Sequence, residues 1–335
     1  MTAEPYRAPS WLPGPHAQTI WPLLIKGPLP RYRRERWETP DGDFIDLDWI
    51  DGDPGTPCVA MFHGLEGSSR SHYARRLMHA VACRRWHGVV PHFRGCSGEP
   101  NRLPRAYHSG DSTEIDWIAR ALHARGFPAL LLTGVSLGGN ALLKWLAEQG
   151  EAAGRLVVAA AAVSSPLDLA AANAELSSGF NLVYARHFLR TLVPAARAKA
   201  RRFPGCIDVR RAEAARTLRD FDDAVTAPLH GFSGADDYYS RCSAGPLLGA
   251  VRVPTLLLHA ANDPFLPATV FPHLTRVPPD LSIEFTPGGG HVGFVHGVPP
   301  GRIDWLPQRL LGHFDRVWPC PATCDNFPFD RERRE

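Results

Sequence analysis

The sequence lacks an apolar segment long enough to cross a membrane. Its longest uninterrupted apolar run covers only residues 156–163, whereas a membrane-spanning helix needs about 20 such residues. The first residues carry neither a basic region nor an apolar stretch, so they do not have the pattern of a secretory signal. We therefore predict a cytoplasmic protein without a transmembrane segment.

Charge and cysteine are equally weak signals. The net charge is only +3 over 335 residues, and no recognition motif accompanies it, so we expect no nucleic-acid partner. The seven cysteines are scattered and fit reduced thiols better than a disulfide framework. Only Cys320 and Cys324 are closely spaced, and because no further ligands with zinc-site spacing lie nearby, unpaired thiols in a tail are favoured. Walker A and His-Glu-x-x-His motifs are absent, and we expect neither a metal nor a cofactor.

Hydrophobic patterning predicts an α/β fold with a mostly parallel sheet flanked by helices on both faces. Apolar runs alternate with segments of helical spacing, which is the order of β–α–β units. The predicted strands are 33–38, 44–50, 57–62, 88–93, 130–133, 155–163, 254–260 and 281–285, and the predicted helices are 73–86, 111–125 and 302–316.

Composition divides the chain into four parts. Residues 1–30 contain seven prolines and are expected to form an irregular segment packed on the surface. Residues 31–165 and 251–318 form the predicted core, and residues 166–250, which have helical stretches without apolar strands, form a helical cap insertion. Within the cap, residues 187–220 are rich in Lys and Arg, which favours a solvated helix face over a site for anionic head groups. Residues 319–335 read as a tail.

The central motif is Gly134-x-Ser136-x-Gly138. A strand-like run precedes it and an Ala- and Leu-rich helical pattern follows it, which is the context of a nucleophile elbow. Small residues on both sides of the serine let the strand and the helix pass closely. The spacing of these glycines differs from that of a dinucleotide fingerprint. We therefore predict that Ser136 is a nucleophile.

A serine nucleophile needs a base and an orienting acid. Asp263 follows the predicted strand 254–260, and His291 follows strand 281–285 after three glycines. Carboxyl ends of parallel strands meet at one edge of a sheet, and the chain order Ser, Asp, His is that of an α/β-hydrolase. The other candidates are His259, His296 and His313 for the base and Asp222, Asp223, Asp236 and Asp237 for the acid.

Two backbone N–H groups, those of Leu65 and Leu137, are the predicted oxyanion hole. His63 precedes Gly64 and could be mistaken for a base, but we expect it to shape this loop. In the cap, Phe180, Tyr184 and Phe188 could line an acyl pocket, although aromatic residues at this spacing also suit a plain helix core.

Several motifs of the chain match those of one known family. They are Trp11-Leu12, His16-x-Gln18-Thr19, residues 63–68, 92–102, 107–110 and 136–140, Asp237-Tyr238-Tyr239 with Cys242-Ser243, and residues 289–294. With these motifs the chain resembles the YheT-like branch of α/β-hydrolases, bacterial relatives of the eukaryotic ABHD acylglycerol and phospholipid esterases. The resemblance implies that Ser136, Asp263 and His291 form a charge-relay triad and that the protein is a carboxylic-ester hydrolase without metal or organic cofactor.

Together these observations predict a serine esterase of the α/β-hydrolase fold that acts on short- to medium-chain acyl esters, with acylglycerols among the candidates. Its partner is a small-molecule ester, and the sequence carries no signal of oligomeric state. Two alternatives remain open: an acyltransferase that uses the same acyl-enzyme, and a ligand-binding protein that kept the fold without catalysis.

Overall fold

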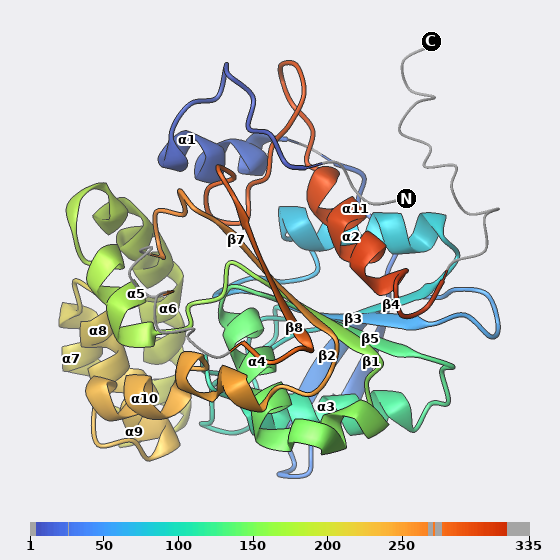
Figure 1. The fold of residues 1–335 in the computed structure, drawn as a ribbon. Coiled ribbons are helices and arrows are strands. Elements are labelled where there is room, and N and C mark those ends of the chain that lie inside the picture. Colours follow the sequence, from blue (N-terminus) through green and yellow to red (C-terminus); the bar gives the residue numbers. More distant parts are fainter. Residues whose placement is uncertain (1–4, 26, 267–270, 272–276, 320–335) are drawn as a thin grey trace.

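An eight-stranded sheet runs through the molecule, flanked on both faces by helices (Figure 1). The computed structural model describes residues 5–25, 27–266, 271 and 277–319. The strand order is β1-β2-β4-β3-β5-β6-β7-β8; β1 and β2 run antiparallel to their neighbours, and the pairs from β4 to β8 are parallel. The predicted mostly parallel sheet is therefore confirmed. The strands are β1 (Arg33–Glu38), β2 (Phe44–Ile50), β3 (Cys58–Phe62), β4 (His87–Pro91), β5 (Leu130–Val135), β6 (Ala159–Val163), β7 (Thr255–Ala260) and β8 (Leu281–Thr286).

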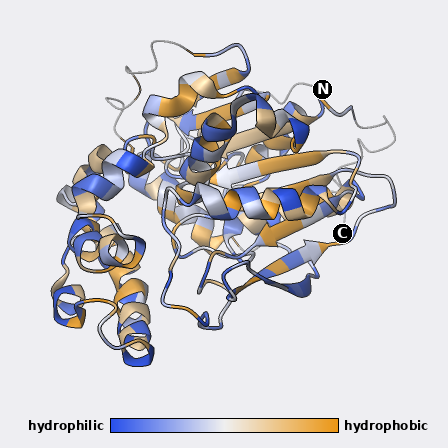
Figure 2. Cartoon of the chain, turned by 90° about the horizontal axis from the view of Figure 1, so that it is seen from below, coloured by the Kyte–Doolittle hydropathy of each residue, from blue (hydrophilic) through white to orange (hydrophobic). Residues whose placement is uncertain are grey.

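Two apolar cores cover the two faces of the sheet, because successive side chains of a strand point to opposite faces. In β5, Leu130 and Leu132 belong to one core and Leu131 to the other. Helices α3 (Ser112–His123) and α4 (Leu137–Gln149) pack on the first face, whereas α2 (His72–Cys83) and α11 (Trp305–Phe314) pack on the second. The strands appear mainly hydrophobic between helices of mixed hydropathy (Figure 2). The predicted strand 155–163 starts too early, because Gly150–Arg155 forms a 3₁₀ helix and β6 begins at Ala159.

A helical insertion lies between β6 and β7 and projects to one side of the sheet (Figure 1). Its helices pack around an apolar cluster that includes Leu189 and Phe221 and that extends to Phe265 and Leu266 of the segment after β7. Residues 187–220 are largely surface here, and Arg197 pairs with Glu213 at 2.6 Å between exposed side chains. Its helices are α5 (Leu169–Leu176), α6 (Leu182–Arg202), α7 (Val209–Ala214), α8 (Leu218–Phe221), α9 (Ala227–His230) and α10 (Ala235–Cys242), with a π-helix over Asp222–Thr226 and 3₁₀ helices over Gly179–Asn181 and Gly245–Ala250.

The N-terminal segment, which its prolines predicted to be irregular, contains two short helical stretches. Pro15–Ile20 forms helix α1 and Trp21–Leu24 a 3₁₀ helix. Pro15 stands at the first position of α1, where a proline is compatible with a helix because its missing N–H would have no intrahelical acceptor. The number of prolines therefore did not reveal these helical stretches, because Pro15 and Pro22 stand at helix starts.

The structure bears on the predicted absence of a transmembrane segment but not on most of the predicted C-terminal tail. Residues 320–335 of the predicted tail, with Cys320 and Cys324, lie outside the described residues. Among the residues that are described, no helix combines the length and the apolar character needed to span a bilayer.

Candidate active site

Ser136 stands at a sharp corner between β5 and α4, with a φ of 52°. The corner depends on its glycines. A Cβ on Gly138 would lie 2.5 Å from the carbonyl oxygens of Phe62 and His63, and a Cβ on Gly134 would lie 2.5 Å from the carbonyl oxygen of Gly138. Because backbone atoms cannot move aside as a flexible side chain can, only glycine fits at both positions. The predicted strand–turn–helix context of Ser136 is therefore present.

The side chains of Ser136, His291 and Asp263 form one hydrogen-bonded chain. His291 Nε2 lies 3.0 Å from Ser136 Oγ, and His291 Nδ1 lies 2.8 Å from Asp263 Oδ2. The Asp263 side chain is fully buried, and its other oxygen accepts a hydrogen bond from the Phe265 N–H at 2.9 Å. The Phe265 ring also lies against the His291 imidazole, with centroids 4.3 Å apart. These contacts hold the imidazole between a carboxylate and a hydroxyl, the arrangement that a general base requires.

The loop after β3 carries Leu65, one of the two predicted oxyanion donors. Two tyrosines hold the residues on either side of it: the Gly64 N–H donates to the Tyr73 hydroxyl and the Glu66 N–H donates to the Tyr107 hydroxyl, both at 2.9 Å. The Tyr107 hydroxyl in turn donates to Glu66 Oε1 at 2.8 Å. Burial raises the pKa of both phenols, so they remain neutral. The loop is thereby pinned on both sides of Leu65.

Leu137, the second predicted donor, is the first residue of α4. The first N–H groups of a helix have no acceptor within it, and they point along the helix axis toward its positive end. Leu65, Ser136, Leu137 and His291 all line the same cavity. Both predicted donors thus belong to the wall in which the serine stands.

The alternative base candidates have other partners or environments. His296 pairs with Asp304 at 2.5 Å, and His313 lies 3.0 Å from the Ala160 carbonyl oxygen. His259 is buried between aromatic rings, and burial lowers its pKa to about 3. His63 is buried too, with its pKa also lowered to about 3; it contacts the Gly64 carbonyl and accepts the Phe93 N–H. A neutral His63 therefore braces the loop before Leu65.

The alternative acids all lie in the cap and are engaged there. Asp222 accepts hydrogen bonds from Thr226 and from Tyr239, at 2.6 and 2.8 Å. The remaining three bind cap groups: Asp223 the Ala235 N–H, Asp236 the Arg219 guanidinium, and Asp237 the Ser233 N–H. None of these four contacts a histidine of the candidate site in the described part of the chain.

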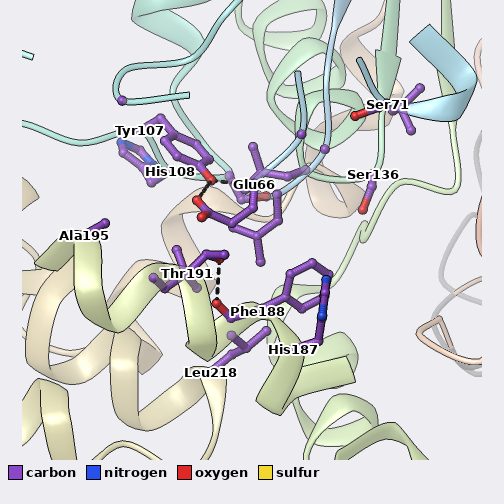
Figure 3. Close-up of a pocket in the computed structure, with 18 of the residues that line it drawn as sticks. Glu66, Ser71, Tyr107, His108, Ser136, His187, Phe188, Thr191, Ala195 and Leu218 are labelled. Atoms are coloured by element: carbon purple, nitrogen blue, oxygen red, sulfur yellow. Dashed lines mark hydrogen bonds between the residues drawn. The ribbon is translucent and has the colours of Figure 1, made fainter. Parts of the chain in front are cut away.

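A cavity of about 850 Å³ lies between the core and the cap, and Ser136 is one of the residues that line it. Figure 3 shows Ser136 facing this space from the core while Phe188 and Thr191 face it from the cap. Tyr184 and Phe188 are among the lining residues, but Phe180 is not. Phe180 precedes α6, is 51% exposed and packs against His16 with ring centroids 4.4 Å apart. The structure therefore does not place Phe180 in the predicted acyl pocket, because Phe180 lies in the 3₁₀ helix before α6 and not on the helix that carries Tyr184 and Phe188.

No group of three or more His, Cys, Asp or Glu side chains among the described residues is arranged to hold a metal ion. The triad distances connect a hydroxyl, an imidazole and a carboxylate directly. The chemistry available at this site is therefore that of a serine nucleophile with a base beside it.

The sequence of residues 57–298 matches a family model described as the α/β hydrolase fold. The chain belongs to the α/β hydrolase family. It is a serine hydrolase of that family, as predicted. The Escherichia coli (strain K12) protein YheT, which is named as an esterase, is 41% identical to it over 304 residues, or 88% of each sequence. The human protein ABHD3, named as a phospholipase, is 29% identical over 327 residues, which are 94% of this chain and 79% of ABHD3. The predicted resemblance to the YheT-like branch is confirmed.

Among solved α/β hydrolase structures, the Pyrococcus furiosus esterase Pf2001 superposes with a TM-score of 0.55. The two sequences are 15% identical, and the alignment covers 85% of this chain and 92% of the esterase. At this identity the likeness concerns the fold, and it agrees with the sheet order and flanking helices described above.

Residue patterning missed the side chains that hold the site together. Tyr73 and Tyr107 bind the loop around Leu65, and Gln18, Thr19 and Asn262 contact the loops of the base and the acid. Gln18, Thr19 and Tyr107 lie in segments that carried the family resemblance. That was the available signal, although no local pattern links such distant positions.

Proposed function

We propose that this α/β hydrolase is a carboxylic-ester hydrolase that acts on short- to medium-chain acyl esters through an acyl-enzyme on Ser136. The observation that carries the proposal is the hydrogen-bonded chain of Ser136, His291 and Asp263 at the wall of a cavity. The esterase and phospholipase names of YheT and ABHD3 support ester chemistry.

In the acylation step, His291 Nε2 removes the Ser136 hydroxyl proton as Oγ attacks the ester carbonyl carbon. Asp263 fixes the imidazole with its Nδ1 proton toward the carboxylate and stabilises the imidazolium that forms. The tetrahedral intermediate then collapses, the bond to the alcohol oxygen breaks, and His291 gives its proton to the leaving alcohol. Ser136 is left as an acyl ester.

In the deacylation step, His291 removes a proton from a water molecule as the water oxygen attacks the acyl carbon. Collapse of the second tetrahedral intermediate returns the proton to Ser136 Oγ and releases the carboxylic acid. In both steps negative charge develops on the former carbonyl oxygen. The N–H groups of Leu65 and Leu137 would bind it, each donor contributing about 2.7–4 kcal/mol to lowering the barrier.

The volume and the lining of the cavity support a preference for esters with short- to medium-chain acyl groups. Its volume of about 850 Å³ lies within the range of pockets that enclose small organic ligands, which is roughly 300–1,000 Å³. Tyr184, Phe188 and Leu192 of α6 line it opposite the serine. An acyl chain of intermediate length would bury its methylenes against these side chains, with acylglycerols among the esters of this size.

The test is hydrolysis of p-nitrophenyl acetate, butyrate and octanoate by the wild-type protein and by Ser136→Ala. We expect release from at least one ester, and a loss of turnover on the order of 10⁴–10⁶ in the variant because the covalent step is removed. Labelling by a fluorophosphonate should likewise depend on Ser136. Folded wild-type protein that neither hydrolyses an ester nor takes the label would overturn the proposal and favour a ligand-binding role.

A further inference from the structure

The acid and base loops of the site come from different strands, yet one side chain from the N-terminal helix connects them. Gln18 Oε1 accepts the Gly289 N–H at 2.7 Å and the Asn262 Nδ2–H at 3.0 Å. Asn262 adjoins Asp263, and its Oδ1 accepts the Gly290 N–H, next to His291, at 3.0 Å. Two side-chain amides therefore tie the acid loop to the base loop.

Thr19, the next residue of α1, holds the backbone of the base itself. Its Oγ1 accepts the His291 N–H at 2.9 Å and donates its own proton to the Pro15 carbonyl oxygen at 2.8 Å. The donation to Pro15 fixes the hydroxyl rotor, so a lone pair points at the His291 amide. Gln18 is anchored in the same way, because its Nε2 donates to the Leu12 carbonyl oxygen at 2.9 Å.

The fit between α1 and the base loop is tight. A Cβ on Gly293 would lie 2.0 Å from the Gln18 carbonyl oxygen, and a Cβ on Gly290 would lie 2.6 Å from Thr19 Oγ1. Gln18 and Thr19 are only 4% and 9% exposed. Figure 1 shows α1 beside the loops that leave β7 and β8. The glycines before and after His291 thus let the loop press directly against the helix.

We propose that α1 is part of the catalytic apparatus: Gln18 and Thr19 are positioning residues that set the register between His291, Asp263 and Ser136. The inference rests on the proposed function, because it concerns how the base of that reaction is held. Neither side chain touches a reacting atom. Each acts by fixing the imidazole within hydrogen-bond reach of the serine, and a misplacement of about 1 Å at this distance costs up to about 100-fold in rate.

Variants of Thr19 can distinguish a positioning role of this residue from a purely structural one, because the two roles predict different effects on kcat. Thr19→Val keeps the shape and removes the acceptor for the His291 N–H, whereas Thr19→Ser keeps the hydroxyl. Thr255→Val is the matched control. Thr255 is also a buried threonine, and its hydroxyl donates to the Val253 carbonyl oxygen at 2.7 Å. It begins β7 at the opposite end of that strand from Asp263.

We would measure kcat and KM for the hydrolysis of p-nitrophenyl butyrate, and separately the rate at which a fluorophosphonate labels the protein. Both measurements are made at a temperature at which every variant is folded. For Thr19→Val we expect kcat and the labelling rate to fall about 10- to 100-fold with KM within about twofold of wild type. Thr19→Ser should recover kcat to within about threefold. Thr255→Val should lower the Tm and leave kcat unchanged.

Gln18→Leu and Asn262→Ala test the bridge between the loops. Each variant removes the hydrogen bond between Gln18 and Asn262 together with one bond to the base loop, from Gly289 or from Gly290. Because the shared bond can be lost only once, the loss of kcat in the double variant should be smaller than the product of the two single losses, which is the non-additivity expected of a contacting pair. Additive losses would argue against the bridge.

The inference is overturned if wild-type protein is active and Thr19→Val lowers only the Tm, or if it raises KM at constant kcat. Equal losses of kcat in Thr19→Val and Thr255→Val would also overturn it. A wild-type protein without Ser136-dependent hydrolysis is a separate outcome, which refutes the proposed function and this inference together.

Discussion

Removing the Tyr107 hydroxyl should weaken the proposed oxyanion hole without touching the triad. Tyr107→Phe leaves the Glu66 N–H without its acceptor, while Tyr73 still holds the Gly64 N–H on the other side of Leu65. Complete loss of one oxyanion donor costs about 2.7–4 kcal/mol. Because one of the two anchors remains, we expect roughly half of this loss, about 1.4–2 kcal/mol, which is a 10- to 30-fold fall in kcat.

The assay is steady-state hydrolysis of p-nitrophenyl butyrate, with Tyr238→Phe as the control. The Tyr238 hydroxyl also accepts a backbone N–H, that of Ser109 at 2.9 Å, but away from the loop of Leu65. Both variants remove the acceptor of a backbone N–H. Tyr238→Phe, whose bond is buried, should lose stability by about 1–3 kcal/mol, and Tyr107→Phe should lose less because its bond is exposed. Only Tyr107→Phe should lose kcat. Equal kcat in the two variants would refute the link between Tyr107 and transition-state stabilisation.

Two predictions concern stability. Gly138→Ala should destabilise the fold by about 3 kcal/mol or prevent folding, because the new Cβ meets two carbonyl oxygens. Urea denaturation measures the free energy of unfolding. The control is Gly154→Ala, whose new Cβ has no neighbouring atom within 4 Å and which should leave the free energy of unfolding nearly unchanged. Burial lowers the pKa of His63 and His259 to about 3. Between these values and about 6.5 the unfolded chain binds more protons, so stability should fall as the pH is lowered from 7.5 to 5. A Tm that stays constant over this range would contradict the neutral state of these histidines.

The elements and residues that sequence reasoning found are those specified by local patterns. The buried strands, such as β5 and β7, are short apolar runs. The glycines on both sides of Ser136 predict the sharp corner, because they allow the strand and the helix to approach closely. Asp263 and His291 could be selected because each follows a strand whose carboxyl end must lie at the same sheet edge.

The features that escaped prediction depend on contacts between distant segments. Helix α1 was hidden by prolines that occupy helix starts, and its contacts with His291 span most of the sequence. Phe180 has the right spacing from Tyr184, but α6 begins only at Leu182, so its ring turns to His16 instead. The start of β6 was misplaced because the apolar run begins while the chain is still turning: the N–H groups of Leu156 and Val157 both donate to the Ala153 carbonyl oxygen, and β6 begins only at Ala159.

The contact between Thr19 and His291 has a consequence for biosynthesis. The two residues are 272 positions apart, so on a translating ribosome the helix emerges on the order of tens of seconds before the loop it must hold. A nascent chain can complete most strands of its sheet and the whole cap during that interval and still carry an inert serine. The proposed ester hydrolysis would therefore begin only after the loop that carries His291 has been made and has packed against the helix.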